Sequence, residues 1–204
     1  HHDITFIRTR VQAWWMELVN DVNAQVINSE ITTLFSYQSA YAYIEGSQFY
    51  QIYYGDHSGG RIRNSSITGE IGFRGSEQVQ YNGEVALEST SIYNAMSAVF
   101  ASVKMKGNMA FQSTKVTKWY NSIIKREYVV MVECNGEGLS NVGMELYSPE
   151  NDRICAGSTD GNGSAAFEIA FDDSNYQKNW RLEVSREGRK FVQSVRLFSS
   201  TPLR

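Results

Sequence analysis

Val26-Ile27-Asn28-Ser29-Glu30-Ile31 is followed at a constant spacing by Ile44-Glu45-Gly46-Ser47-Gln48-Phe49 and then by Ile62-Arg63-Asn64-Ser65-Ser66-Ile67. Each copy opens on an aliphatic residue, places Asn or Gly third and Ser fourth, and closes on a large apolar residue. A fixed internal period is the sequence signature of a repeat architecture. We expect a weaker fourth copy at Gln80-Tyr81-Asn82-Gly83-Glu84-Val85, with a corner insertion that shifts the register by about a residue between positions 67 and 103.

The residue types at the repeated positions suit a coil of parallel strands stacked about 4.8 Å apart. Apolar side chains at the same place in successive coils stack inward, so we expect Ile44 and Ile62 to lie one above the other in the core. Asn and Gly suit the corners because they adopt left-handed backbone conformations at little cost. Alternation of small or aliphatic with aromatic residues over 40–44 excludes a helix. The pattern predicts a parallel β-solenoid of about six coils over residues 10–115.

The C-terminal part follows a different pattern, in which short apolar segments alternate with Gly, Asn or Asp turns. Such spacing is typical of a small antiparallel β-sandwich. The expected strands are Glu127–Glu133, Val142–Tyr147, Ile154–Ser158, Ala165–Phe171, Trp180–Ser185 and Phe191–Phe198. The predicted fold is therefore all-β, with a parallel β-helix over residues 1–118, a junction over 119–126 and the sandwich over 127–204.

The junction lies within a segment, Lys115 to Arg126, that carries two neighbouring aromatic residues, Trp119 and Tyr120. A solenoid exposes unpaired backbone groups at each end and needs a cover there. We expect these two side chains to seal the C-terminal end of the solenoid rather than to bind sugar. The other end carries Trp14 and Trp15 in an apolar segment, which predicts either further coils upstream or end-to-end contact with a partner.

At the level of whole segments, the chain resembles a known family. The resemblance rests on AQVINSEITTLFSYQSAYAYIEGS at positions 24–47, the Trp119-Tyr120 pair and VRLFSSTPL at positions 195–203. These segments resemble archaeal and bacterial cell-surface proteins with right-handed parallel β-helix repeats, of the pectin-lyase-like superfamily. Such proteins often carry a C-terminal immunoglobulin-like or carboxypeptidase-regulatory-like domain, and the turn over positions 159–163 resembles the latter. The resemblance implies an architecture rather than an activity.

One departure from that family is the short coil, which runs only from Val26 to Ile44 and from Ile44 to Ile62. A coil of this length also suits a left-handed helix built from hexapeptide repeats, but the aliphatic residues of this sequence do not recur with a hexapeptide period. We therefore expect the right-handed winding.

Composition narrows the class of protein further. Net charge is −3 over 204 residues, which argues against a nucleic-acid backbone as the main partner, and no apolar run approaches the length of a membrane-spanning helix. Only 20% of residues are charged, a composition common in exported β-proteins, so we expect an extracellular or cell-surface location. Cys134 and Cys155 can form one disulfide or remain as two buried thiols.

A cluster of tyrosines offers the first candidate binding site. Six of them crowd into two coils: Tyr37, Tyr41, Tyr43, Tyr50, Tyr53 and Tyr54. Alternation along a strand sends some of these rings outward, where flat faces can stack on sugars or on a neighbouring protein. The competing interpretation is cross-strand packing on one face of the solenoid.

A second candidate is a charged ladder. Glu70, Glu88 and Lys106 repeat with the same period as the aliphatic positions and would stack on one outer face, with Arg74 and Glu77 nearby. Polysaccharide lyases and glycosidases need carboxylates that converge in a groove. The competing interpretation is a solvated row of alternating charge, so we assign no catalytic residue.

Three segments bear on metal binding. We interpret Asp56-His57 as a loop, His1 as part of a leftover purification tag, and Asp172-Asp173-Ser174-Asn175 as a polar turn, because a metal site needs three or four converging ligands. We therefore predict no metal and no other cofactor.

Together these features favour a non-enzymatic structural or adhesive module of a cell-surface protein, the C-terminal part of a longer chain. Its expected partners are neighbouring copies, other cell-surface proteins or a polysaccharide. The alternatives are a carbohydrate-active β-helix enzyme and a phage or surface-lattice assembly protein.

Overall fold

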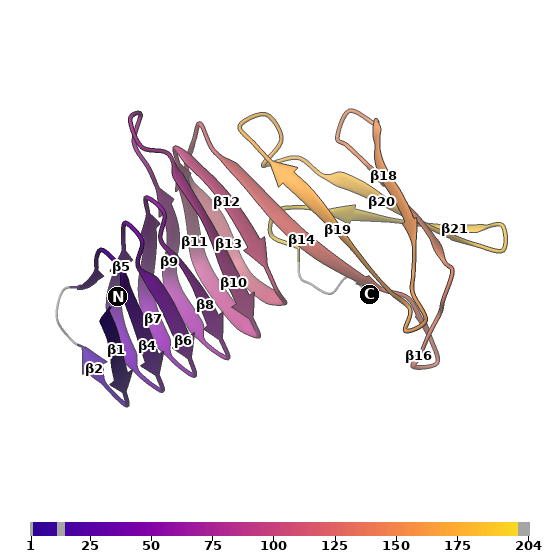
Figure 1. Cartoon of the computed structure of the whole chain (residues 1–204). Coiled ribbons are helices and arrows are strands. Elements are labelled where there is room, and N and C mark those ends of the chain that lie inside the picture. Colours follow the sequence, from indigo (N-terminus) through magenta and orange to yellow (C-terminus); the bar gives the residue numbers. More distant parts are fainter. Residues whose placement is uncertain (1, 12–14, 200–204) are drawn as a thin grey trace.

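The computed structural model describes residues 2–11 and 15–199, and every regular element in these ranges is a β-strand (Figure 1). The strands wind into a parallel β-solenoid of about six turns with right-handed-like winding, followed by antiparallel sheets at the C-terminus. The predicted fold class is confirmed. Within the described ranges no helix is long and apolar enough to cross a membrane.

Two sheets form the walls of the solenoid. Sheet A contains β1 (His2–Ile7), β4 (Val22–Ile27), β6 (Tyr41–Glu45), β8 (Gly59–Arg63), β10 (Tyr81–Glu88), β12 (Ala101–Lys106), β14 (Ile123–Met131) and β19 (Ser164–Phe171), in that order. Sheet B contains β13 (Met109–Tyr120), β11 (Thr90–Val99), β9 (Ser66–Arg74), β7 (Gln48–Gly55) and β5 (Glu30–Ser36), beside which lie β2 (Arg10–Val11) and β3 (Met16–Leu18). The chain alternates between the sheets, and its strands pair in parallel until β19 joins β14 antiparallel.

The repeated aliphatic positions stack as expected. Val26 pairs with Ile44 and Ile44 with Ile62, and all three side chains are fully buried between the sheets. Leu87 continues this row by pairing with Ile62. The predicted stacking of Ile44 and Ile62 is confirmed, and it supplies the core that holds one coil on the next.

The corners are built from residues with positive φ, as the Asn and Gly positions predict. Asn28, Gly46 and Asn64 have φ values of 49°, 59° and 47° in successive coils. At these angles most side chains are strained, whereas Gly and Asn are tolerated. The repeated Asn/Gly position therefore marks the place where each coil turns from sheet A to sheet B.

The fourth copy of the repeat lies elsewhere than predicted. Val85 pairs with Gly60 and Leu87 with Ile62, so the true copy begins at Leu87 rather than at Gln80. The cause is an insertion at positions 75–80, between β9 and β10, which the sequence pattern underestimated. Every alignment based on the constant period is therefore wrong beyond this point.

The C-terminal part packs a four-stranded sheet against the end of sheet A. That sheet has the order β18 (Arg153–Ser158), β17 (Gly143–Tyr147), β20 (Trp180–Arg186) and β21 (Arg189–Val195), and a hairpin of β15 (Glu133–Cys134) and β16 (Glu137–Gly138) lies between β14 and β17 in the chain. The six predicted strands each overlap an observed one. Phe171 of β19 meets Trp180 of β20 edge to face, with 6.1 Å between ring centroids, inside the shared core.

The solenoid and the C-terminal sheets share one strand. β14 pairs with β12 over Ile123–Arg126 and with β19 over Ile124–Met131, so the expected junction at positions 119–126 consists of the end of β13 and the start of β14. Trp119 stacks on Tyr176 with 4.5 Å between ring centroids and covers the solenoid end, as predicted. Tyr120 instead remains 57% exposed.

A buried arginine fastens this junction. Arg126 is fully buried, donates to the Leu197 carbonyl, and places its guanidinium 4.8 Å from the ring centroid of Phe111 and 4.5 Å from that of Tyr128. The Tyr128 hydroxyl donates to the Arg196 carbonyl at 2.6 Å. The segment after β21 is thus bonded to the last strand of the solenoid.

Replacing a stacked core residue tests the coil register. Ile62→Ala removes buried methyl groups from the row between Ile44 and Leu87, so we expect unfolding to become easier by about 2 to 5 kcal/mol. Chemical denaturation followed by circular dichroism measures this. Gln48→Ala, at an exposed position of β7, is the control and is expected to change stability little. Equal effects of both changes would contradict the stacked core.

Candidate functional site

A groove on the outer face of sheet B lies at the end of one row of cross-strand neighbours, and it is lined by Glu70, Arg74, Gly75, Ser97, Val99, Thr117 and Lys118. Tyr53 of β7 pairs with Gly72 of β9, Gly72 with Ser97 of β11, and Ser97 with Lys118 of β13. Because side chains on adjacent strands of one face stand side by side, large residues at both ends and small ones between them leave a depression. The groove has a volume of about 450 Å³.

Tyr53 of β7 lies behind the groove and contacts two of its lining residues, Glu70 and Arg74. Its ring lies over Gly72, where an added β-carbon would collide with the ring, so glycine is required there. Phe35 stacks on the same ring with 5.2 Å between centroids, and the Arg74 guanidinium lies 3.9 Å from its centroid. The ring is held between these two neighbours, and Tyr53 is only 5% exposed.

Glu70 lies at one end of the groove and is fixed by two hydroxyl groups. The Tyr53 hydroxyl donates to its Oε2 at 2.7 Å, and the Thr117 hydroxyl donates to its Oε1 at 3.3 Å. Burial, and then the hydrogen bond to Glu70, raise the pKa of Tyr53 to about 12. The phenol therefore stays protonated at neutral pH and remains the donor.

The groove also holds donors with no protein acceptor. Arg74 and Lys118 are exposed, and among the described residues neither forms a salt bridge or a side-chain hydrogen bond. Ser97 is 3% exposed and lines the groove, yet its Oγ makes no hydrogen bond within the described part of the chain. Two cations and a buried hydroxyl beside a carboxylate can hold a hydroxylated, charged ligand.

The six tyrosines expected to bind do not form one patch. Tyr54 is fully buried in the core, stacked on Phe73, and Tyr53 lies behind the groove, bonded to Glu70. Tyr41 and Tyr43 belong to β6 in sheet A, and the Tyr43 hydroxyl donates to Glu45 at 2.6 Å.

The remaining two tyrosines cover glycines of neighbouring coils. The Tyr37 ring lies over Gly55, and the ring of Tyr50, a residue that is 55% exposed, lies over Gly69. Tyr37 and Tyr53 are the two members of the set that share an aromatic stack, through Phe35 between them.

The predicted stacking of Glu70, Glu88 and Lys106 on one outer face is wrong, because the insertion shifts the register of β10 and β12. Glu70 lies in sheet B, whereas Glu88 and Lys106 lie in sheet A. Glu88 pairs with Arg61 at 2.7 Å and with Arg63 at 3.0 Å, while Lys106 pairs with Glu84 at 2.8 Å. Of the predicted group, Glu70 and Arg74 do come together, in the groove described above.

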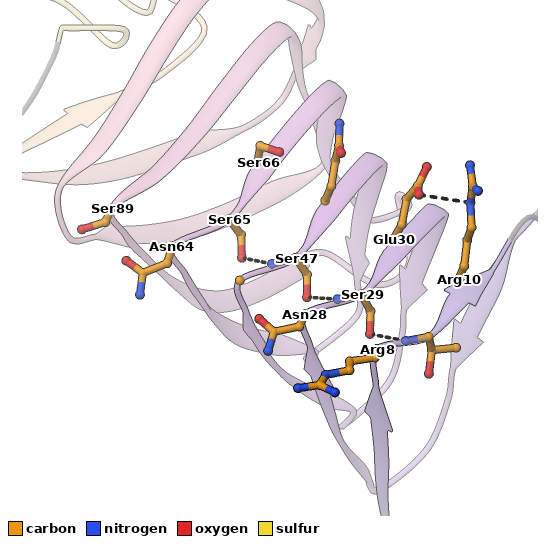
Figure 2. A pocket seen from close by; sticks show the side chains of 13 residues that line it. Arg8, Arg10, Asn28, Ser29, Glu30, Ser47, Asn64, Ser65, Ser66 and Ser89 are labelled. Carbon is orange, nitrogen blue, oxygen red and sulfur yellow. Dashed lines mark hydrogen bonds and ion pairs between the residues drawn. The ribbon is translucent and has the colours of Figure 1, made fainter.

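A second hollow, of about 640 Å³, follows the corner between sheets A and B (Figure 2). Figure 2 shows Ser29, Ser47 and Ser65 in a row: Ser47 Oγ accepts from the Ser29 N–H at 3.0 Å, and Ser65 Oγ accepts from the Ser47 N–H at 3.1 Å. Each hydroxyl donates in turn to the carbonyl of the second residue before it. These hydroxyls are fully used by the fold, so we assign this hollow a structural role.

The polar segments considered for metals are occupied by local hydrogen bonds. The Asp56 carboxylate accepts from the Gln38 N–H at 3.2 Å at the second corner. Ser174 donates to the Asp172 carboxylate and holds its pKa below the ordinary value. No group of three or more His, Cys, Asp or Glu suited to a metal occurs in residues 2–11 and 15–199. His1 lies outside these ranges, as does Trp14.

The two cysteines are exposed free thiols in the structure, Cys134 in the β15–β16 hairpin and Cys155 in β18. The disulfide is not formed, and the alternative of two buried thiols does not match either. The physical reason is that the residues belong to different sheets: β15 pairs with β16, whereas β18 pairs with β17.

Comparison with known proteins assigns this chain to no family. No protein-family profile matches the chain. No curated protein matches it significantly. Among solved structures, the Bacillus anthracis TIE protein is similar over 44% of this chain and 17% of that one, with 16% sequence identity and a TM-score of 0.29. The chain thus matches about a sixth of that protein's length, and a TM-score of this size carries no conclusion about function.

Alkaline titration tests the buried tyrosines. Burial raises the pKa of Tyr128 to about 12, as for Tyr53, and raises those of Tyr54 and Tyr81 further. A raised folded-state pKa gives stability that is complete below the unfolded value of about 10 and is lost as pH rises beyond it. We expect tyrosinate absorbance to develop in two stages, the later one together with unfolding. Tyr53→Phe should reduce the late stage.

The chain has 12 tyrosines, so the stages can be counted. Ionisation of all of them in one stage at the ordinary pKa of tyrosine, with circular dichroism unchanged, would contradict the burial.

Thiol titration tests the state of the cysteines. We expect two reactive thiols per native chain, because both are exposed and unpaired. A coloured thiol reagent measures the number before and after denaturation, and the two values should agree. Zero thiols in both conditions would show a disulfide instead.

Proposed function

We propose that this chain is a non-enzymatic structural or adhesive module of an extracellular surface protein, with the solenoid as a rigid rod and the groove on sheet B as a polysaccharide-binding site. The observation that carries the proposal is the groove on the outer face of β9, β11 and β13, whose lining includes the hydrogen-bonding side chains of Glu70, Arg74, Ser97, Thr117 and Lys118. Sugar hydroxyls both donate and accept, and the groove offers Glu70 as acceptor with Arg74 and Lys118 as donors.

The continuity of sheet A supports a role as a rod. β14 belongs to both the solenoid and the C-terminal sheets, and Arg126 bonds the two parts together. A module joined by a shared strand transmits force without a flexible linker. We further propose that the solenoid is of the right-handed, pectin-lyase-like type and that the C-terminal sheets are an immunoglobulin-like or regulatory-like cap.

The groove chemistry favours binding over hydrolysis. Glycosidases use a pair of carboxyl groups on either side of the scissile bond. Among the described residues that line the groove, Glu70 is the one carboxylate, and it already accepts from Tyr53 and Thr117.

A lyase is the second candidate, because proton abstraction needs one base and a cation rather than two acids. Glu70 and Arg74 line the same groove and supply both types of group. Formation of an unsaturated product from an acidic polysaccharide would favour this candidate.

The N-terminal end supports the proposed partners. β1 is the last strand of sheet A at that end and pairs only with β4 among the described residues, while Trp15 is 58% exposed. An open strand edge is a template for another strand. We propose that a neighbouring copy pairs there, as in a cell-surface or lattice assembly.

A binding screen tests the proposed site. The full chain is titrated by calorimetry with a panel of neutral and acidic soluble polysaccharides, and we expect at least one to bind. Thr117→Trp fills the groove from an exposed position and should weaken that binding by about tenfold or more, equivalent to about 1.4 kcal/mol. Tyr41→Ala, at an exposed position of sheet A, is the control and should bind normally.

Thermal unfolding of both variants confirms that the fold is retained. Binding that survives Thr117→Trp unchanged, or the absence of binding to every polysaccharide, would overturn the proposal. Release of shorter chains from a bound polysaccharide would show that the chain is a carbohydrate-active enzyme instead.

A further inference from the structure

The cations of the groove differ from most others on the solenoid. Five other cations on sheets A and B pair with acids, as Arg10–Glu30, Arg61–Glu88, Arg63–Glu88, Lys104–Glu168 and Lys106–Glu84. Lys115 and Lys125, like Arg74 and Lys118, form no salt bridge among the described residues, but they do not line the groove. Arg74 and Lys118 line one groove with Glu70, yet Glu70 accepts from Tyr53 and Thr117 rather than from either cation. Since the chain as a whole has a net charge of −3, this local positive charge is not part of a generally basic surface.

Arg74 is held in place while its donors remain available. Its guanidinium rests on the Tyr53 ring, 3.9 Å from the centroid, and Tyr53 is itself supported by Phe35. A cation on an aromatic face keeps the N–H groups at its edge directed outward. Such an arrangement lowers the side-chain conformational entropy that is lost when the guanidinium binds an anion.

The floor of the groove supplies an independent observation. Ser97 is only 3% exposed, lines the groove, and has an Oγ with no hydrogen-bond partner among the described residues. Buried hydroxyls almost always have a partner, because an unmade hydrogen bond is costly. A ligand oxygen that accepts from Ser97 would satisfy it.

We propose, on the basis of the polysaccharide-binding function above, that the groove is specific for acidic polysaccharides. It seats one oxyanion of the sugar chain, a carboxylate or a sulfate ester, against Arg74, Lys118 and the Ser97 hydroxyl. Glu70 stays outside this seat and accepts from the hydroxyl groups of the same sugar unit, which gives the groove its orientation. Charge-assisted hydrogen bonds to the two cations supply the preference for acidic over neutral chains.

The test compares four soluble polymers on the full chain by calorimetry. They are a polyuronic acid, its methyl ester as the neutral match, a sulfated polysaccharide, and polyglutamate as an acidic peptide. We expect the polyuronic acid or the sulfated chain to bind at least about tenfold more tightly than the methyl ester, and more weakly as salt rises. The better of the two identifies the oxyanion.

Charge variants locate the seat. Lys118→Glu changes an exposed residue and should abolish most of the acidic preference, and Arg74→Gln should reduce it by about tenfold. Ser97→Ala should weaken binding severalfold while leaving the salt dependence unchanged. Lys125→Gln removes an exposed lysine on β14 of sheet A and is the matched control, expected to bind like the original chain. Thermal unfolding checks that each variant is folded, and Lys118→Glu leaves the Tyr53 contacts in place.

The outcomes separate this inference from the proposed function. Equal binding of the methyl ester, unaffected by Lys118→Glu, would overturn the oxyanion seat while polysaccharide binding stands. Failure of every polysaccharide to bind would overturn both. Polyglutamate binding as tightly as the polyuronic acid, with the same sensitivity to Lys118→Glu, would replace the sugar with an acidic protein partner.

Discussion

The whole solenoid depends on one constraint, which is that each coil must turn at the same place and leave the next coil in register. At the Asn28 corner the chain turns through a positive φ of 49°. The serine that follows, Ser29, bonds to the next coil and so fixes the spacing between the two coils. Ser47 Oγ accepts the N–H of Ser29 in one coil, and Ser65 Oγ accepts the N–H of Ser47 in the next. Because these bonds run between coils, they keep the aliphatic rows stacked and place the strands of sheet B side by side. The ladder runs as far as Ser65, directly before β9, so it sets the position of the strand that carries Glu70 and Arg74.

The groove is bounded on one side by β9, where Gly72 lies between the lining residues Glu70 and Arg74 and leaves room for the Tyr53 ring of β7. Lys118 then rises on the far side, opposite Ser97. A side chain at position 72 would displace the Tyr53 ring, and with it the contacts of that ring.

Part of this structure could be predicted from the sequence. The constant period of the first three copies located the stacking of Ile44 and Ile62, because backbone pairing requires equal coil lengths over that segment. Prediction failed after the insertion at positions 75–80, since no local pattern reports how many residues a corner loop adds. Glu70 and Arg74 were therefore found on their own strand, whereas Ser97 and Lys118, on strands beyond the insertion, could not be aligned with them. The glycines of β9 opposite the tyrosines of β7 were the available signal, and they lie next to the near side of the groove but do not indicate its far wall.

That far wall depends on the C-terminal sheets as much as on the solenoid. β13 is the last strand of sheet B and pairs on one side with β11, so its other edge needs support. Trp119, next to Lys118, stacks on Tyr176 from the C-terminal part, and Arg126 packs against Phe111 at the other end of β13. Since neighbouring residues of a strand point to opposite faces, Trp119 anchors the strand from within while Lys118 faces the groove. The cap that ends the solenoid therefore also fixes one side of its proposed binding site, which explains in physical terms why the two parts share a strand instead of a linker.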